Sequence, residues 1–134
     1  MEYRWEEYLL SDEKSLLSME AVFGLLSKTY WAKDRPIEKI EASIENSLCW
    51  GLFHNNRQIG LARIVTDNVS VYYLCDVVID KEYRKKGLGS FMLKNILRNF
   101  ENQNMKGLLV TRDAQEFYKK FGFNVPAEPI LMLK

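Results

Sequence analysis

The stretch from Val77 to Ser90 constrains this chain more than any other part of its 134 residues. It begins with an apolar run typical of a buried strand, passes through a basic turn with two glycines, and continues as a helix. Gly87 and Gly89 lack a Cβ, so the backbone there can adopt a positive φ and approach a ligand closely. A helix start leaves N–H groups without partners, and its dipole is worth roughly 0.3–1 kcal/mol per neighbouring charge. Together with the cations of residues 84–86, this arrangement predicts a pyrophosphate site.

Two common phosphate-binding motifs do not fit this stretch. It has no Gly-Lys-Ser/Thr, which excludes a Walker A loop, and it lacks the third glycine of a dinucleotide-binding Gly-x-Gly-x-x-Gly. A flexible glycine turn whose basic residues are merely solvated is the alternative interpretation of the same residues.

Composition narrows the class of protein further. Hydrophobic residues make up 47% and charged residues 28%, which fits one folded domain over residues 1–134. The formal net charge of +1 argues against a generally basic nucleic-acid binder, and no apolar run approaches the roughly 20 residues of a membrane span. The acidic, aromatic start is unlike a secretory signal, so we expect a cytoplasmic protein with reduced thiols at Cys49 and Cys75. His54 stands alone, so no metal site is expected.

The spacing of apolar residues predicts an α/β chain of the α+β kind with a mixed central sheet. Turn signals and helical periodicity give the order β-α-α-β-β-β-α-β-α-β. Meandering strands followed by a strand-helix-strand crossover require both antiparallel and parallel neighbours. The expected strands are 3–9, 49–54, 58–66, 69–79, 107–111 and 130–133, and the expected helices are 11–28, 36–48, 88–101 and 114–121.

Two short motifs resemble a single family. Arg84-x-x-Gly87-x-Gly89, at a strand-to-helix junction, resembles the Arg/Gln-x-x-Gly-x-Gly/Ala signature of the GNAT N-acetyltransferase superfamily, which forms its coenzyme-A pyrophosphate loop. Residues 114–123, Ala-Gln-Glu-Phe-Tyr-Lys-Lys-Phe-Gly-Phe, resemble the closing helix and turn of that family. The order of elements agrees, and the resemblance extends from about Trp5 to residue 134, including features of a bacterial acetyltransferase subgroup.

This resemblance implies an enzyme that transfers an acetyl group from acetyl-CoA to a primary amine by direct attack in a ternary complex. It implies that the backbone of Val77, Val78 and Ile79 binds the pantetheine arm. Tyr118 matches the tyrosine that protonates the departing thiolate, and a phenol with a pKa near ~10 keeps its proton at neutral pH; core packing is the alternative role. Thr111 stands where many members have an asparagine, so it receives no role. The residues implied to hold the pyrophosphate are Arg84, Lys85, Lys86, Gly87, Leu88, Gly89 and Ser90.

The general base and the acceptor site are less closely defined by motifs. Asp76 directly precedes the expected pantetheine-binding segment, and partial burial would raise its pKa toward the range of a general base. A carboxylate paired with an arginine such as Arg63 is the alternative. In the family, the loop between the first two helices borders the acceptor, which makes Tyr30, Trp31 and Arg35 candidates for acceptor binding. Anchoring of that loop by Trp31 is the competing interpretation.

Two other classes of function stay open at this point. An intact loop without an assigned base also suits a GNAT-fold module that binds acyl-CoA or a partner without turnover. Residues 84–86 with Arg98 and Lys106 would be the contacts of a nucleic-acid-binding domain, which the near-zero net charge disfavours. We therefore expect a small-molecule or peptide amine as partner, no nucleic acid and no membrane, in a protein for which a homodimer is compatible with the family.

Overall fold

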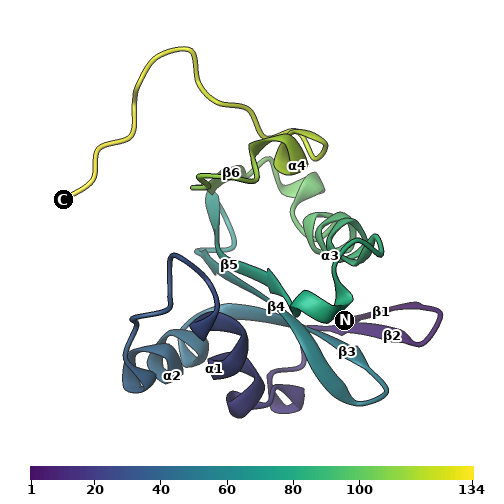
Figure 1. The fold of residues 1–134 in the computed structure, drawn as a ribbon. Helices are drawn as coiled ribbons and strands as arrows, with labels where there is room; N and C mark the ends of the chain where they lie inside the picture. The colour runs from purple at the N-terminus through teal and green to yellow at the C-terminus, as the bar shows by residue number, and fades with distance from the viewer.

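A computed structural model describes all 134 residues, and its strands form one six-stranded sheet (Figure 1). The strands follow one another across the sheet in chain order, from β1 to β6. The first five are antiparallel neighbours, and β6 pairs parallel with β5 after a helical crossover. The predicted mixed sheet is thereby confirmed. The strands are β1 (Glu2–Trp5), β2 (Tyr8–Ser11), β3 (Leu48–His54), β4 (Arg57–Thr66), β5 (Val71–Ile79) and β6 (Lys106–Leu109).

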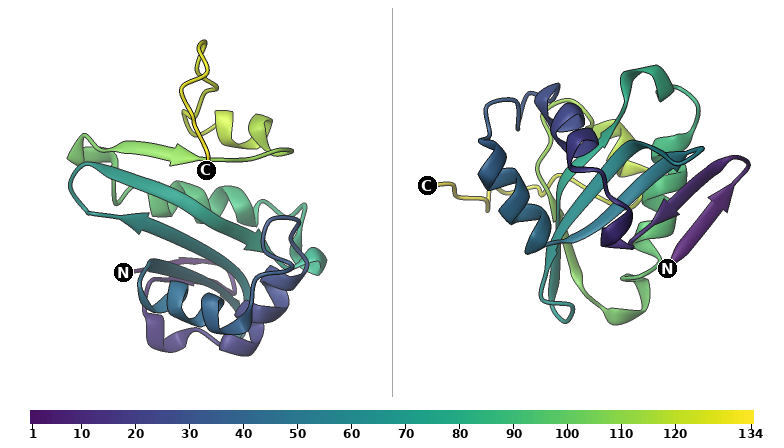
Figure 2. Two further views of the ribbon diagram at one scale, coloured as in Figure 1. Left: turned by 90° about the vertical axis from the view of Figure 1, so that its left-hand side faces the viewer. Right: turned by 90° about the horizontal axis from the view of Figure 1, so that it is seen from below.

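Helices cover both faces of this sheet (Figures 1 and 2). On one face, α1 (Met19–Ser27) and α2 (Ile37–Glu45) bury their apolar side chains against β4 and β5. On the other face, α3 (Leu88–Leu97) packs into a larger core, and α4 (Gln115–Lys119) lies beside it. None of these helices combines the length and apolar character needed to cross a bilayer. Three short 3₁₀ turns complete the structure: η1 (Lys14–Leu16), η2 (Lys81–Tyr83) and η3 (Glu101–Gln103).

The expected elements at the two ends of the chain differ most from the structure. The first strand is a hairpin of β1 and β2, because Glu6 adopts φ 53° and reverses the chain. The first helix begins at Met19, because Ser18 caps it by accepting a hydrogen bond from the Ala21 amide at 3.2 Å. The expected strand 130–133 is absent, and this run pairs with no strand of the chain.

A β-bulge in β5 changes the face on which its side chains lie. Arg63 pairs with Asp76 whereas Ile64 pairs with Leu74, so Cys75 is an extra residue without a partner in β4. Leu74 therefore packs in the α3 core, while Val78, four residues later, packs against α1 and α2. An unbroken strand would place both side chains on the same face.

The pairing between β5 and β6 is short. It ends at Leu74 and Leu109, and β5 continues to Ile79 with only β4 beside it. Figure 1 shows the chain after β6 turning away from β5 toward α4. Residues 75–79 of β5 thus have one edge with no neighbouring strand beside the start of α3, which we call the free edge of β5.

Candidate active site

The turn between β5 and α3 presents a row of unpaired backbone amides. None of the N–H groups of residues 85–90 donates to an acceptor in the protein. Positive φ angles at Lys85 (64°) and Gly87 (80°) turn the chain into the helix, and the buried Leu88 fixes the helix start against the core. The Arg84 side chain donates from Nε to the Ile79 carbonyl at 3.1 Å. Converging free amides at a helix start suit a multiply charged anion.

The turn requires glycine at positions 87 and 89 for different structural reasons. Gly87 occupies the left-handed region, and a Cβ there would also lie 3.4 Å from the Trp5 ring. Gly89 is helical, but a Cβ on it would lie 3.3 Å from Cζ of Phe117 on α4. The absence of that Cβ lets α4 approach the first turn of α3. The two sequence motifs are therefore in direct contact, through Phe117, which the sequence alone does not single out.

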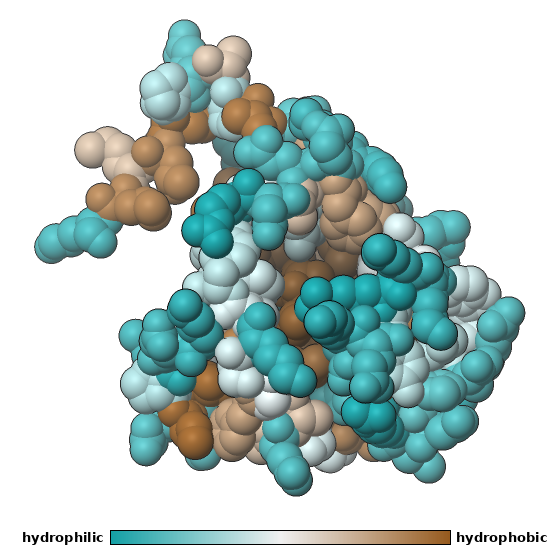
Figure 3. Space-filling model, in the orientation of Figure 1, coloured by the Kyte–Doolittle hydropathy of each residue, from teal (hydrophilic) through white to brown (hydrophobic).

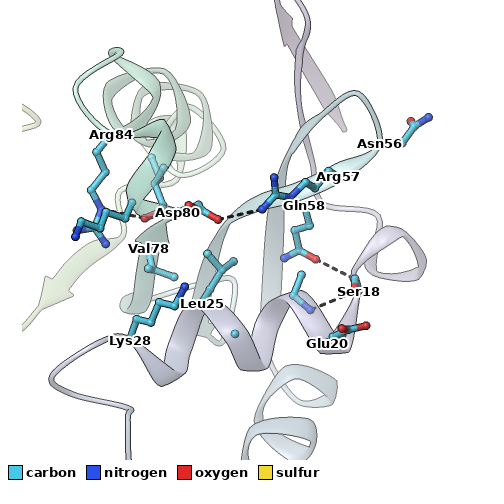
Figure 4. Close-up of a pocket in the computed structure, with 14 residues that line it drawn as sticks. Ser18, Glu20, Leu25, Lys28, Asn56, Arg57, Gln58, Val78, Asp80 and Arg84 are labelled. Carbon is cyan, nitrogen blue, oxygen red and sulfur yellow. Dashed lines mark hydrogen bonds and ion pairs between the residues drawn. The ribbon is translucent and has the colours of Figure 1, made fainter.

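A cavity of about 410 Å³ adjoins the end of β5 on the α1 side (Figure 4). Of the predicted coenzyme-binding residues, Val78, Ile79 and Arg84 line it, together with residues of α1 and the β3–β4 turn. Lys28 lies at its α1 wall, while the nearby Arg57 guanidinium is 3.6 Å from the Asp80 carboxylate. The cavity thus connects the end of β5 with Arg84, the first residue of the basic turn, whereas residues 85–90 do not line it.

Tyr118 lies half-buried on α4. Its ring contacts Phe117 and Phe123, with centroids 5.1 and 6.1 Å away, and its hydroxyl makes no hydrogen bond within the chain. Burial, and to a smaller degree the nearby Tyr30 and Asp113, raise the pKa of Tyr118 to about 12. The phenol therefore holds its proton firmly at neutral pH. Core packing and proton donation are both compatible with this position.

Asp76 is fully buried, and both oxygens of its carboxylate accept hydrogen bonds. Its carboxylate accepts from Arg63 Nε at 2.6 Å, from Arg35 Nη1 at 2.9 Å and from the Trp31 indole N–H at 2.8 Å. Burial alone would raise the pKa of Asp76, but the hydrogen bonds and charges of the two arginines outweigh it and lower this pKa. A paired carboxylate with a lowered pKa is a poor proton acceptor. The geometry favours the arginine-paired alternative over the predicted general base.

The pairing of β5 and β6 ends at Leu74 and Leu109, and beyond it a gap separates β5 from the chain that follows β6. The loop between α1 and α2 is attached to both sides of this gap. Trp31 and Arg35 tie it to Asp76 on β5. Tyr30 ties it to the β6–α4 connection, because its hydroxyl accepts from the Arg112 amide at 3.0 Å and the Arg112 guanidinium lies 4.0 Å above its ring. The three predicted acceptor-binding residues therefore anchor the loop. Trp31 and Tyr30 remain 40% and 38% exposed, so their outer faces are still accessible.

Comparison with known proteins agrees with this geometry. Residues 10–123 match the model of the acetyltransferase (GNAT) family. The chain belongs to this family. A crystal structure of a GNAT-family acetyltransferase from Xanthomonas campestris pv. campestris is 31% identical, covers 95% of this chain and 92% of its own, and superposes with a TM-score of 0.87. An acetyltransferase of Gibberella zeae is 29% identical over 139 residues, which are 87% of this chain and 78% of the relative.

A more distant GNAT structure, from Elizabethkingia anophelis with acetyl-CoA bound, shares the fold at 16% identity and a TM-score of 0.71, over 91% of this chain and 79% of its own. The chain spans about half the length of three plant relatives, 52%, 44% and 50%.

Within this GNAT protein, the remaining reactive side chains have local partners. Cys49 is buried, and burial raises its pKa to about 11. Cys75 sits at the bulge, where burial also raises its pKa, and both thiols are free. The Thr111 hydroxyl accepts from the Ala114 amide at 3.1 Å, just before α4. His54 Nδ1 lies 2.9 Å from the Tyr83 hydroxyl. These groups therefore have structural contacts within the fold, and the contact of His54 is with Tyr83, two residues before the row of free amides.

Proposed function

We propose that this GNAT protein is an N-acetyltransferase that transfers the acetyl group of acetyl-CoA to a primary amine in a ternary complex. The observation that carries the proposal is the row of unpaired amides at residues 85–90, directly beside the free edge of β5. Acetyl-CoA would supply an activated acetyl thioester. The acetyltransferase names of the relatives and the acetyl-CoA bound to one structural neighbour support this assignment. We place the protein in the cytoplasm, as the sequence predicts.

The residues present fit the coenzyme. The amides of residues 85–90 would hold its pyrophosphate, and the exposed Lys85 and Lys86 would add positive charge. The backbone of Val77, Val78 and Ile79 would hydrogen-bond the pantetheine arm as an added strand, because β6 does not cover this edge. Holding amine and thioester side by side can lower the barrier by roughly 7–11 kcal/mol, so positioning would supply much of the catalysis.

Proton movement would involve Tyr118 rather than Asp76. The Tyr118 hydroxyl holds its proton at Oη, so it can donate a hydrogen bond to a departing thiolate, while its raised pKa makes it a weaker acid than an ordinary phenol. Asp76 would act as a positioning residue that fixes the Tyr30–Arg35 loop over the gap. The amine, with a pKa near ~10.4 for a lysine-like group, would lose its proton to water.

Calorimetry with coenzyme A tests the binding half of the proposal. Gly87→Ala places a Cβ at φ 80°, which costs about 1–2 kcal/mol, so we expect the affinity to fall roughly tenfold. Glu41→Ala is the control, because this exposed residue of α2 does not line the cavity and the affinity should be unchanged. An equal loss in both variants, or no binding by the wild type, would refute the assignment.

A non-catalytic acyl-CoA-binding module is the second candidate. It is favoured because the pairing of Asp76 with Arg35 and Arg63 leaves the chain without an assigned general base. Release of free thiol from acetyl-CoA over a panel of amines separates the two functions. The panel should include polyamines, amino acids, aminoglycosides and peptides with free N-termini or lysines. Coenzyme binding without turnover on any amine would support the module and contradict the enzyme.

A further inference from the structure

The Arg112 side chain, in the connection between β6 and α4, carries a positive charge that no carboxylate of the chain balances. Its guanidinium forms no ion pair and no side-chain hydrogen bond, and it stacks on the Tyr30 ring with Cζ 4.0 Å from the ring centroid. The Arg112 backbone amide donates to the Tyr30 hydroxyl at 3.0 Å, which fixes the ring beneath the guanidinium. Stacking uses only the face of the guanidinium, so its N–H donors stay free to bind a ligand in their own plane.

This guanidinium lies close to the proposed reaction site. Burial raises the pKa of Tyr118 to about 12, and smaller contributions come from Tyr30 and Asp113, which places both of these residues near the Tyr118 phenol. Arg112 is stacked on the first of them and adjacent in sequence to the second. The Tyr30 hydroxyl accepts from the Arg112 amide, but its own proton has no acceptor in the chain. An acceptor at Tyr118 would therefore find two uncommitted donors beside it.

The ionised residues that hold the loop between α1 and α2 carry an excess of positive charge. Arg35 and Arg63 share the single carboxylate of Asp76, and Arg112 adds a further cation on the other side of the gap. Asp113 offers one negative charge next to Arg112, and it forms no ion pair. Opposite charges that are adjacent but not paired with each other match a ligand that has both a carboxylate and an ammonium group.

The surroundings favour one carboxylate over other anions. In Figure 3 an apolar hollow opens between the sheet and α3, and hydrophilic surface surrounds its mouth. A charge at the rim of apolar surface attracts a ligand more strongly than a charge in open water. The guanidinium fork fits a carboxylate through two parallel N–H···O bonds. A phosphate can carry two negative charges, and the second would lie unpaired near Asp113.

We propose that Arg112 is a specificity-determining residue and that the acceptor is a free amino acid. This inference rests on the proposed acetyl transfer and names its substrate class. The acceptor carboxylate would bind the Arg112 guanidinium and the Tyr30 O–H, which holds the amine beside the thioester. The amine nitrogen forms the new C–N bond, the C–S bond breaks, Tyr118 protonates the sulfur, and water takes the amine proton. The products are an N-acetyl amino acid and coenzyme A.

The first test compares glycine, lysine and phenylalanine with their α-amides as acceptors, by thiol release from acetyl-CoA. The amide keeps the size of the acceptor and removes its negative charge. Hydrogen bonds to charged groups are the stronger ones, so kcat/KM of the wild type should be roughly 10- to 100-fold higher for the acids. Arg112→Gln should abolish this preference. Arg112→Lys keeps the charge without the fork and should retain part of it.

Arg4→Gln is the matched control for this comparison. Arg4 is an exposed arginine on β1, at the opposite edge of the sheet from β6, so its replacement should leave the preference unchanged. If Arg112 served only to anchor Tyr30, Arg112→Gln would weaken the acids and the amides equally. That result would overturn the inference, as would equal use of acids and amides by the wild type. Better use of polyamines or of O-phosphoethanolamine than of amino acids would overturn it too, while acetyl transfer would stand.

Calorimetry separates a failure of this inference from a failure of the proposed function. Lysine and lysinamide are titrated into the protein in the presence of excess coenzyme A, which allows binding but no turnover. The wild type should bind lysine roughly tenfold more tightly than lysinamide, and Arg112→Gln should lose the difference with unchanged affinity for coenzyme A. This result, without turnover of any amine, would contradict the acetyltransferase and retain the amino-acid site. Equal affinity of the wild type for both ligands would overturn the site whether or not the protein is an enzyme.

Discussion

Replacing Asp76 by asparagine separates a positioning role from a base role. Asparagine keeps the size of the side chain and one carbonyl acceptor, but it removes the charge that faces Arg35 and Arg63. Asp76 has no exposed surface, whereas the side chains of Arg35 and Arg63 are 20% and 12% exposed. The arginines can therefore recover only part of the lost interaction from water.

The expected loss of stability follows from this burial. Removing one member of a fully buried ion pair costs about 3–5 kcal/mol. Because asparagine retains one acceptor and the arginines reach solvent, we expect about 3 kcal/mol for Asp76→Asn. At roughly 3–5 °C per kcal/mol for a domain of this length, the melting temperature should fall by about 10 °C. This is a large fraction of the 5–15 kcal/mol that holds an ordinary domain.

Kinetics distinguish the two roles further. If Asp76 positions the loop, KM for the amine should rise several-fold, and the acidic limb of the pH–rate profile should persist. Trp31→Phe removes one of the hydrogen bonds to Asp76 but leaves the carboxylate in place. It should therefore also raise KM for the amine, by a smaller factor. An Asp76→Asn variant with wild-type stability and no acidic limb would show instead that the carboxylate is the base.

Four further outcomes test other parts of the structure. Tyr118→Phe should lower kcat by about 10²-fold with little change in coenzyme affinity, and an unchanged kcat would remove the acid role. Gly89→Val should displace Phe117 and weaken coenzyme binding in calorimetry, and wild-type affinity would contradict the contact between the two motifs. Since the pKa of Asp76 is lowered by folding, its stabilisation is complete above the unfolded pKa near ~4 and is lost as pH falls through the lower folded value. Urea midpoints at pH 6 and pH 3 should therefore differ less for Asp76→Asn than for the wild type, and an equal difference would refute the linkage. Cys75 should react slowly with alkylating reagents at pH 7, because its pKa is raised, and rapid modification would contradict its burial.

The parts of the fold that sequence predicted well are those that local chemistry determines. The turn at residues 84–90 depends on glycines, adjacent cations and a helix start, all within seven residues. The parallel pair of β5 and β6 depends on an intervening helix, which periodicity reveals. The family motif in α4 is equally local.

The full set of contacts of Asp76 cannot be predicted locally, although pairing with Arg63 is one of the two alternatives that the sequence offers. Its partners Trp31, Arg35 and Arg63 are 45, 41 and 13 residues away in the chain. The bulge at Cys75 also reverses the side-chain alternation that a sequence pattern assumes. An aspartate in an apolar strand suggests either a raised pKa or a paired carboxylate, and the folded structure decides for the pair by adding Arg35 to Arg63. The run 130–133 has a strand-like composition, but the structure pairs it with no strand of the chain.

The early separation of β6 from β5 connects these observations. If the parallel pairing continued beyond Leu74, β6 would occupy the edge of β5 that lies beside the free amides of residues 85–90. Because it stops there, the chain turns toward α4 and brings Tyr118 close to the Tyr30 loop. That loop then bridges the gap, bound to β5 through Asp76 and to the far side through Arg112.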